Sequence, residues 1–122
     1  MGMSLRIELF PADMDAFVDF YCGVLGFVLR RDERDSADPY VFVQRDQVSI
    51  GAAGRGALDQ AARRPPLGVE VVLEVDDLAA ERDRVRVAGW PVEEDLSDRP
   101  WGLRDFRVLD PAGYYLRLTS RD

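Results

Sequence analysis

The side chains of this sequence that could do chemistry are carboxylates and guanidiniums, because its 122 residues include no histidine and only one cysteine. Histidine is the most common general base and transition-metal ligand, so its absence narrows the possible reactions. Three glutamates, Glu8, Glu70 and Glu74, stand in two short apolar segments that read as strands. Glu70 and Glu74 share a strand face, since side chains alternate with period two. A carboxylate on such a face can bind a cation, or act as a general base if burial raises its pKa.

Carboxylates on an inward strand face need partners, because an unpaired buried charge is costly. Arg6 and Arg117 are the expected partners, and we expect an ion pair between Glu70 and Arg117. Glu8 and Glu74 would then remain free for a cationic ligand, or would lie at a subunit interface. The alternative is a metal-free isomerase or lyase in which one of the three glutamates is the general base.

Aromatic side chains form the second group of candidate binding residues. Trp101 precedes Gly102 at the entrance of an expected strand, where it would be a stacking platform or would pack on its own sheet. Tyr40 and Phe42 share one strand face, where they would wall a flat ligand or fill the interior. The expected ligand-binding residues are therefore Trp101, Tyr40, Phe42, Phe10, Glu8, Glu74, Ser49 and Tyr115.

Two successive halves with the same order of elements, strand-helix-strand-strand-strand, are expected to position these residues. Asp13 and Asp77 are the expected N-caps of helices that end before Gly26 and Gly89. The last two strands flank the turn 110–113, which reads Asp-Pro-Ala-Gly. The expected strands are 5–10, 27–31, 40–44, 47–51, 69–75, 90–96, 103–109 and 114–118, and the expected helices are 14–25 and 78–88, with one further helical turn at 58–62.

Repetition of one element order at half the chain length predicts a duplicated module. The first βαβββ module spans about 4–52, a connector rich in Gly, Ala, Arg and Pro spans 53–68, and the second module spans about 69–120. The expected fold is therefore α+β, with two curved mixed or antiparallel sheets, each covered by one outer helix.

The paired βαβββ pattern, the helix segment DFYCGVLGF and the closing segment PWGLRDFRVLDPAGYYLRL resemble the vicinal oxygen chelate superfamily. That superfamily includes glyoxalases, extradiol dioxygenases and bleomycin resistance proteins. The closing segment is most similar to the metal-free bleomycin-resistance branch. The resemblance implies a homodimer that sequesters an aromatic, cationic natural product such as a bleomycin-, mitomycin- or enediyne-type antibiotic, without catalysis and without a cofactor.

Enzymes of this superfamily hold a divalent metal with four side chains, two from each module. The corresponding positions here are Arg6, Ser49, Glu70 and Arg117. Arginine stays protonated and has no lone pair to donate, so this set would repel a dication. We therefore expect no metal, and a metal-dependent lyase or dioxygenase is the less favoured reading.

Composition excludes other classes of function. The net charge of −7 and the sequence pI near 4.6 disfavour binding to nucleic acid. No apolar run is as long as a membrane span and no signal peptide is visible, so we expect no membrane contact and a cytoplasmic location. The lone Cys22 falls within an apolar helical pattern and is expected to be a buried filler.

Overall fold

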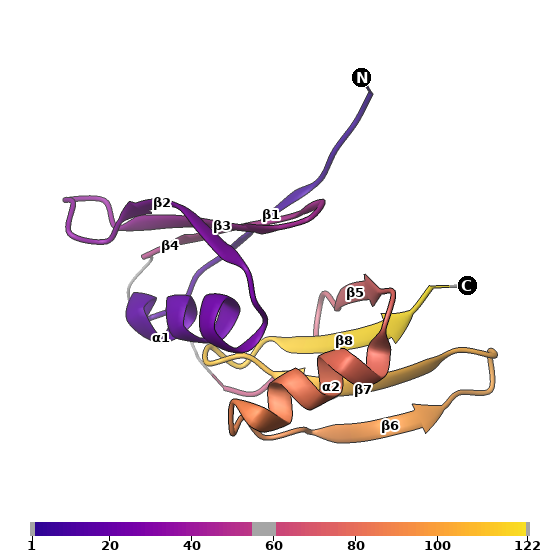
Figure 1. Cartoon of the computed structure of the whole chain (residues 1–122). Coiled ribbons are helices and arrows are strands. Elements are labelled where there is room, and N and C mark those ends of the chain that lie inside the picture. Colours follow the sequence, from indigo (N-terminus) through magenta and orange to yellow (C-terminus); the bar gives the residue numbers. More distant parts are fainter. Residues whose placement is uncertain (1, 55–60, 122) are drawn as a thin grey trace. The chain divides into compact units, whose positions relative to one another are not determined.

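The computed structural model describes residues 2–54 and 61–121, and these residues divide into two compact units, 1–60 and 61–122. Each unit has the order strand-helix-strand-strand-strand (Figure 1), so the two predicted βαβββ modules are confirmed. The units are called module one and module two below, and each is described by itself. The helical turn expected at 58–62 falls largely outside the described residues.

Module one is a four-stranded sheet in the order β1-β4-β3-β2. The first strand pairs in parallel with the last, whereas β3 pairs antiparallel with both of its neighbours, so the sheet is mixed. The parallel pairing sets Arg6 level with Ser49 and Glu8 level with Gly51. The elements are β1 (Arg6–Leu9), α1 (Met14–Val18), η1 (Asp19–Val24), β2 (Val28–Glu33), β3 (Tyr40–Arg45) and β4 (Val48–Ala53).

The first helical segment differs from the uninterrupted α-helix that the sequence predicts. It begins as α1 and continues as the π-helical η1, in which the N–H of Leu25 donates to the carbonyl of Phe20, five residues earlier. The wider turn lets two neighbouring aromatic side chains, Phe20 and Tyr21, be buried together in edge contact with ring centroids 4.9 Å apart. Gly26 follows at φ 76° and ends the segment, as predicted.

Module two repeats the arrangement as a sheet in the order β5-β8-β7-β6, with β5 and β8 parallel. The Asp110 carboxylate accepts hydrogen bonds from the N–H groups of Ala112 and Tyr114, which fixes the predicted turn. The elements are β5 (Val71–Val75), α2 (Leu78–Val87), β6 (Glu94–Asp98), β7 (Arg104–Leu109) and β8 (Tyr115–Ser120).

The sixth strand begins later than the sequence pattern predicts. Trp90 lies outside it, because its backbone N–H donates to the carbonyl of Val85 in α2 at 3.2 Å. The following Pro91 has no N–H with which to join a ladder. Regular pairing with β7 therefore starts only at Glu94.

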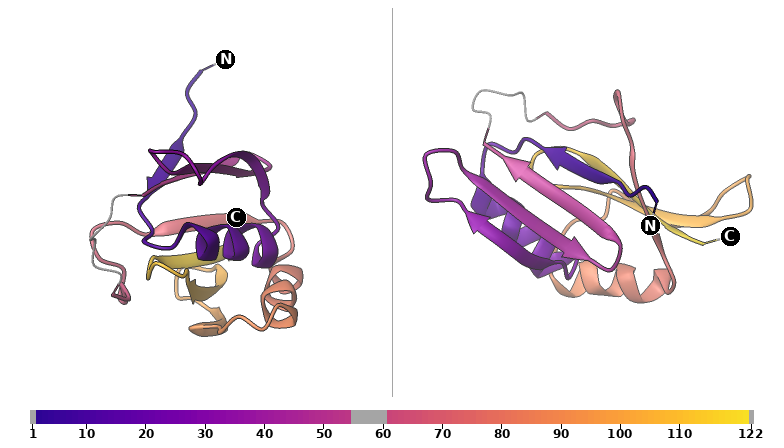
Figure 2. Two further views of the ribbon diagram at one scale, coloured as in Figure 1. Left: turned by 90° about the vertical axis from the view of Figure 1, so that its left-hand side faces the viewer. Right: turned by 90° about the horizontal axis from the view of Figure 1, so that it is seen from above.

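Each sheet packs its apolar face against its own helix (Figures 1 and 2) and carries the alternate side chains on the opposite face, which follows from the period-two alternation of the strands. The buried face of module one includes Val41, Val43 and Ile50, and that of module two includes Phe106, Leu116 and Leu118. The opposite face of each sheet, here called the open face, carries the charged and aromatic candidates.

Cys22 is half-buried, so the expectation that it is a buried filler is wrong. No described helix is long and apolar enough to span a bilayer.

Both N-caps are confirmed, and removing either carboxylate should destabilise the fold. Asp13 accepts a hydrogen bond from Ala16 N–H at 2.9 Å, and Asp77 accepts one from Ala80 N–H at 3.1 Å. We expect Asp13→Ala and Asp77→Ala each to lower the free energy of unfolding by about 1 kcal/mol. Asp83→Ala, on the exposed face of α2, is the matched control and should stay within about 0.5 kcal/mol of wild type. Urea titration measures all three, and cap variants as stable as the control would contradict the assignment.

Candidate functional site

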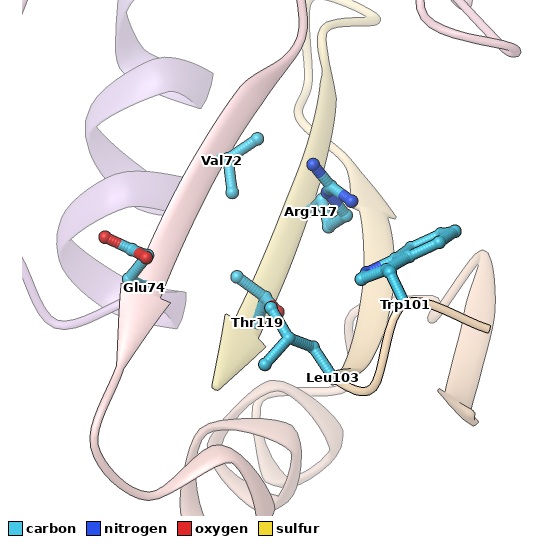
Figure 3. Close-up of a pocket in the computed structure, with 6 residues that line it drawn as sticks. All are labelled: Val72, Glu74, Trp101, Leu103, Arg117 and Thr119. Atoms are coloured by element: carbon cyan, nitrogen blue, oxygen red, sulfur yellow. The ribbon is translucent and has the colours of Figure 1, made fainter. Parts of the chain in front are cut away.

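An open pocket of about 370 Å³ lies on the open face of module two (Figure 3). It is formed where the parallel pairing of β5 with β8 places Val72 level with Arg117 and Glu74 level with Thr119. The loop between β6 and β7 closes the remaining side with Trp101 and Leu103. The six lining residues are Val72, Glu74, Trp101, Leu103, Arg117 and Thr119.

Trp101 is held at this pocket by a tight turn of the backbone. Gly102 N–H donates to the carbonyl of Arg99 at 3.0 Å, and Arg99 N–H donates to that of Leu103 at 2.8 Å. Gly102 adopts φ 93°, a conformation that favours glycine. The turn leaves the Trp101 side chain 55% exposed, so its position depends on the backbone and much of its surface is open for stacking.

Arg117 contacts both the Trp101 indole and the Glu70 carboxylate. One of its Nη atoms lies 3.1 Å from the carboxylate of Glu70, which confirms the predicted ion pair. Its guanidinium carbon lies 5.9 Å from the centroid of the Trp101 ring, within the range of a cation–π interaction. A residue expected at a degenerate metal position is thus part of the pocket wall.

Glu74 provides the negative charge of the pocket. Its carboxylate forms no hydrogen bond or ion pair with any other residue that the structure describes, and its side chain is exposed. Figure 3 shows it on the outer side of β5, across the pocket from Trp101. The neighbouring Thr119 hydroxyl donates to the carbonyl of Arg104 at 3.0 Å and is therefore engaged in the fold. The pocket thus combines an aromatic wall, an apolar floor and one carboxylate.

A buried charge network lies beside the pocket on the same face. Asp105 is fully buried and accepts hydrogen bonds from Arg99 and Arg107. Tyr115, an expected ligand-binding residue, instead joins this network: Arg107 donates to its hydroxyl at 3.5 Å, which donates to Glu94 at 3.3 Å. Burial would raise the pKa of Asp105, but the bonds from Arg99 and then Arg107 outweigh burial and lower it.

Module one brings Glu8 and Tyr40 together, but leaves neither free. Glu8 lies 3.0 Å from the Arg6 guanidinium and accepts a hydrogen bond from the Tyr40 hydroxyl at 3.1 Å. Burial, and then this bond, raise the pKa of Tyr40. The expectation that Glu8 is free for a cation is therefore wrong. A side chain on Gly51 would overlap both the Glu8 carboxylate and the Tyr40 hydroxyl, so the contact requires glycine there.

The other module-one candidates surround this cluster. Phe42 is half-buried beneath Arg6, whose guanidinium carbon lies 5.9 Å from the ring centroid. Ser49 accepts a hydrogen bond from the Gln44 side chain at 3.1 Å. Phe10 is half-buried just beyond the end of β1. Their roles in ligand binding remain predictions.

The donor set at the family-type metal positions does not suit a metal. Counting from the helix caps, β1 is equivalent to β5, and the strand registers then make Gly51, and not Ser49, the counterpart of Arg117. Gly51 offers no side chain, Arg6 and Arg117 are cations, and Glu70 is neutralised by Arg117. The described residues contain no cluster of three or more acidic or cysteine side chains able to hold an ion.

The arrangement also disfavours two of the three candidate general bases. Glu8 and Glu70 are each engaged in an ion pair with an arginine, so neither carboxylate is free to take a proton from a substrate. Glu74 lacks such a partner among the described residues, but it is exposed on an open pocket, where nothing desolvates it. The geometry is better suited to binding than to proton abstraction.

Sequence reasoning missed three residues of the pocket: Val72, Leu103 and Thr119. The alternation of the strands could have identified two of them. Val72 lies between Glu70 and Glu74 on one strand face, and Thr119 follows Arg117 by two residues. Leu103 depends on the loop before β7, whose path no periodicity predicts.

The chain matches a known protein family. Residues 4–118 match the family model described as the Glyoxalase/Bleomycin resistance protein/Dioxygenase superfamily. No curated protein matches the sequence.

Solved structures share the fold at low identity. A bleomycin resistance determinant encoded on the transposon Tn5 is 21% identical, with a TM-score of 0.80 over 99% of both chains. A bleomycin-binding protein complexed with bleomycin is 21% identical, with a TM-score of 0.78 over 99% of this chain and 100% of that one. TioX from Micromonospora sp. ML1 is 24% identical, with a TM-score of 0.78 over 98% of both.

Replacing Gly51 tests the module-one cluster. We expect Gly51→Ala to break the hydrogen bond between Tyr40 and Glu8, so that the pKa of Tyr40 falls toward its ordinary value. Titration of labelled tyrosine side chains by NMR measures the shift. Gly54→Ala is the matched control, because its added carbon would meet only Pro39 at 3.6 Å. An unchanged Tyr40 titration in Gly51→Ala would show that the hydrogen bond does not form.

The buried Asp105 makes the free energy of unfolding depend on pH in the acidic range. Its folded-state pKa is lowered, so its contribution is fully present above the unfolded value of about 3.9 and is lost as the pH falls through the folded value. We expect the free energy of unfolding to decrease below about pH 4. NMR titration of the Asp105 carboxyl carbon should give a pKa below the ordinary aspartate value of about 3.9. A pKa at or above that ordinary value would contradict the network.

Proposed function

The chain belongs to the Glyoxalase/Bleomycin resistance protein/Dioxygenase superfamily, and we propose that it is a metal-free binding protein for an aromatic, cationic small molecule. The single observation that carries the proposal is the pocket of module two, which is lined by the exposed Trp101, by apolar side chains and by Glu74, whose carboxylate has no partner among the described residues. An indole surface stacks on planar ring systems, and a carboxylate attracts the cation of such a molecule.

The size of the pocket fits this ligand class. A volume of about 370 Å³ is near the lower end of the range for small-molecule sites. The walls of such sites are mainly apolar and carry a few polar groups. It accommodates a planar ring system rather than a whole glycopeptide. A larger ligand would place its aromatic part here and extend beyond the open mouth.

Antibiotic resistance by sequestration is the function that we propose on this basis. The ligand would be an antitumour antibiotic of the bleomycin, mitomycin or enediyne type, and binding would lower its free concentration without breaking any bond. The likeness of the fold to the bleomycin-binding protein supports the proposal. The net charge of −7 supports it too, since it favours association with cations. We further propose a cytoplasmic homodimer, for which light scattering of the purified protein is the test.

Removing the indole should abolish most of the affinity. We expect isothermal titration with bleomycin and mitomycin to detect binding of at least one of them, and Trp101→Ala to weaken it about tenfold or more, because stacking on an aromatic side chain is worth about 1–3 kcal/mol. Trp101→Phe should retain part of the affinity.

The matched control for Trp101→Ala is Val87→Ala, which removes an apolar side chain that is 89% exposed on α2, away from the pocket. It should bind like wild type. Binding that is unaffected by Trp101→Ala would contradict the proposed site, and no binding of aromatic cations at high micromolar concentration would contradict the function.

A further inference from the structure

One hydrogen-bond donor of the Arg117 side chain has no acceptor among the described residues. A guanidinium carries five N–H donors in a planar fork. The structure pairs one Nη atom with Glu70 at 3.1 Å, yet the Nε of Arg117 is buried and has no hydrogen-bond partner among the described residues. Buried N–H donors in folded proteins nearly always have an acceptor, so this one requires an explanation.

No described side chain that lines the pocket accepts a hydrogen bond from this donor. Val72 and Leu103 are apolar, and the indole of Trp101 can only donate. The Thr119 hydroxyl donates to the carbonyl of Arg104, and its oxygen forms no hydrogen bond with Arg117. The remaining lining residue, Glu74, lies on the outer side of β5 (Figure 3) and makes no contact with Arg117.

The neighbouring strand β7 adds a second cation, and its carboxylate, Asp105, already accepts from Arg99 and Arg107. Arg107 is level with Arg117 in the pairing of β7 with β8, so the two guanidiniums extend from adjacent positions on one face. Asp105 and Tyr115 hold Arg107 in place, at 3.3 Å and 3.5 Å from its Nη atoms. Arg117 is therefore flanked by a fixed cation, and such a pair favours an oxygen acceptor between or beside them.

The duplicated module shows what a completed arrangement looks like. At the position equivalent to Arg117, module one has Gly51, and the space above it is filled by the Glu8 carboxylate. There, acid and donors satisfy one another, because Glu8 accepts from both Arg6 and Tyr40. Among the described residues, the buried donor without an acceptor lies at the module-two site.

From these contacts we infer that the ligand of the Trp101 pocket carries an oxygen acceptor, a carboxylate or a ring carbonyl, that binds to the Nε side of Arg117 while its cation binds to Glu74. The inference rests on the proposed function and narrows its ligand class to planar aromatic compounds that are polar at both ends. Arg117 would thus be a specificity-determining residue, and not only the internal partner of Glu70.

Three probes that share a naphthalene ring test the inference: 2-(aminomethyl)naphthalene, 2-naphthoate and the zwitterion 6-(aminomethyl)-2-naphthoate, which carries its two charges at opposite ends of the ring. We expect the zwitterion to bind about tenfold more tightly than the amine, because a charge-assisted hydrogen bond to the guanidinium adds to the shared stacking. Arg117→Gln should abolish this advantage, so that the variant binds the zwitterion no more tightly than the amine. Arg31→Gln is the matched control, since Arg31 also lies over an aromatic ring, 5.7 Å from that of Tyr40, but in module one.

Side-chain NMR of the wild-type protein gives a readout that does not depend on a variant remaining folded. The Nε–H signal of Arg117, assigned by its loss in Arg117→Lys, should shift on addition of the zwitterion or 2-naphthoate and stay in place with the amine. An Nε–H signal that does not respond to either carboxylate would overturn the inference.

The outcomes separate this inference from the proposed function. If the amine binds in a Trp101-dependent manner and the zwitterion binds no more tightly, the inference fails and the proposed function stands. If no probe and no antibiotic binds in a Trp101-dependent manner, both fail. A Trp101-dependent preference for the zwitterion that Arg117→Gln removes supports both.

Discussion

The parallel pairing of the first and last strands in each module is the constraint on which the rest of the structure depends. In module two it sets β5 beside β8, so that Val72 and Arg117, 45 positions apart in the sequence, become neighbours. The pairing also fixes the face on which each side chain emerges, because a shift of one residue would exchange the buried and open faces. The helix α2 covers the apolar face of this sheet, so the charged side chains emerge on the open face.

An open sheet face rich in arginine must neutralise its charges, and the two modules do so differently. In module one the Arg6, Glu8 and Tyr40 groups satisfy one another above Gly51. In module two, Asp105 is buried between Arg99 and Arg107, while Arg117 is held by Glu70 alone. The unequal pairing explains why the pocket, the exposed indole and the unused donor all occur on the second copy. The two similar faces therefore differ in how their arginines are paired.

The same substitutions distinguish this chain from the metal enzymes of its superfamily. A divalent ion needs neutral or anionic donors, and here the corresponding positions hold two arginines, a glycine and a glutamate already paired with arginine. Arg117 occupies the place of a ligand and contacts Trp101 instead. The chain therefore shares the scaffold of the superfamily but not a donor set suited to a divalent ion.

Local signals in the sequence were sufficient for the elements: the caps at Asp13 and Asp77, the glycines that end the helices, the turn at Asp110 and the alternation of the strands. They also indicated the ion pair of Glu70 with Arg117, because charges on one inward face must be paired. What the sequence could not determine depends on contacts between distant residues. The π-helical turn, the capture of Glu8 by Tyr40 and Arg6, and the late start of β6 all arise from packing. Only the register of β5 on β8, together with the turn that presents Trp101, decided that Glu74, Trp101 and Arg117 line one pocket, because that register is set by tertiary pairing.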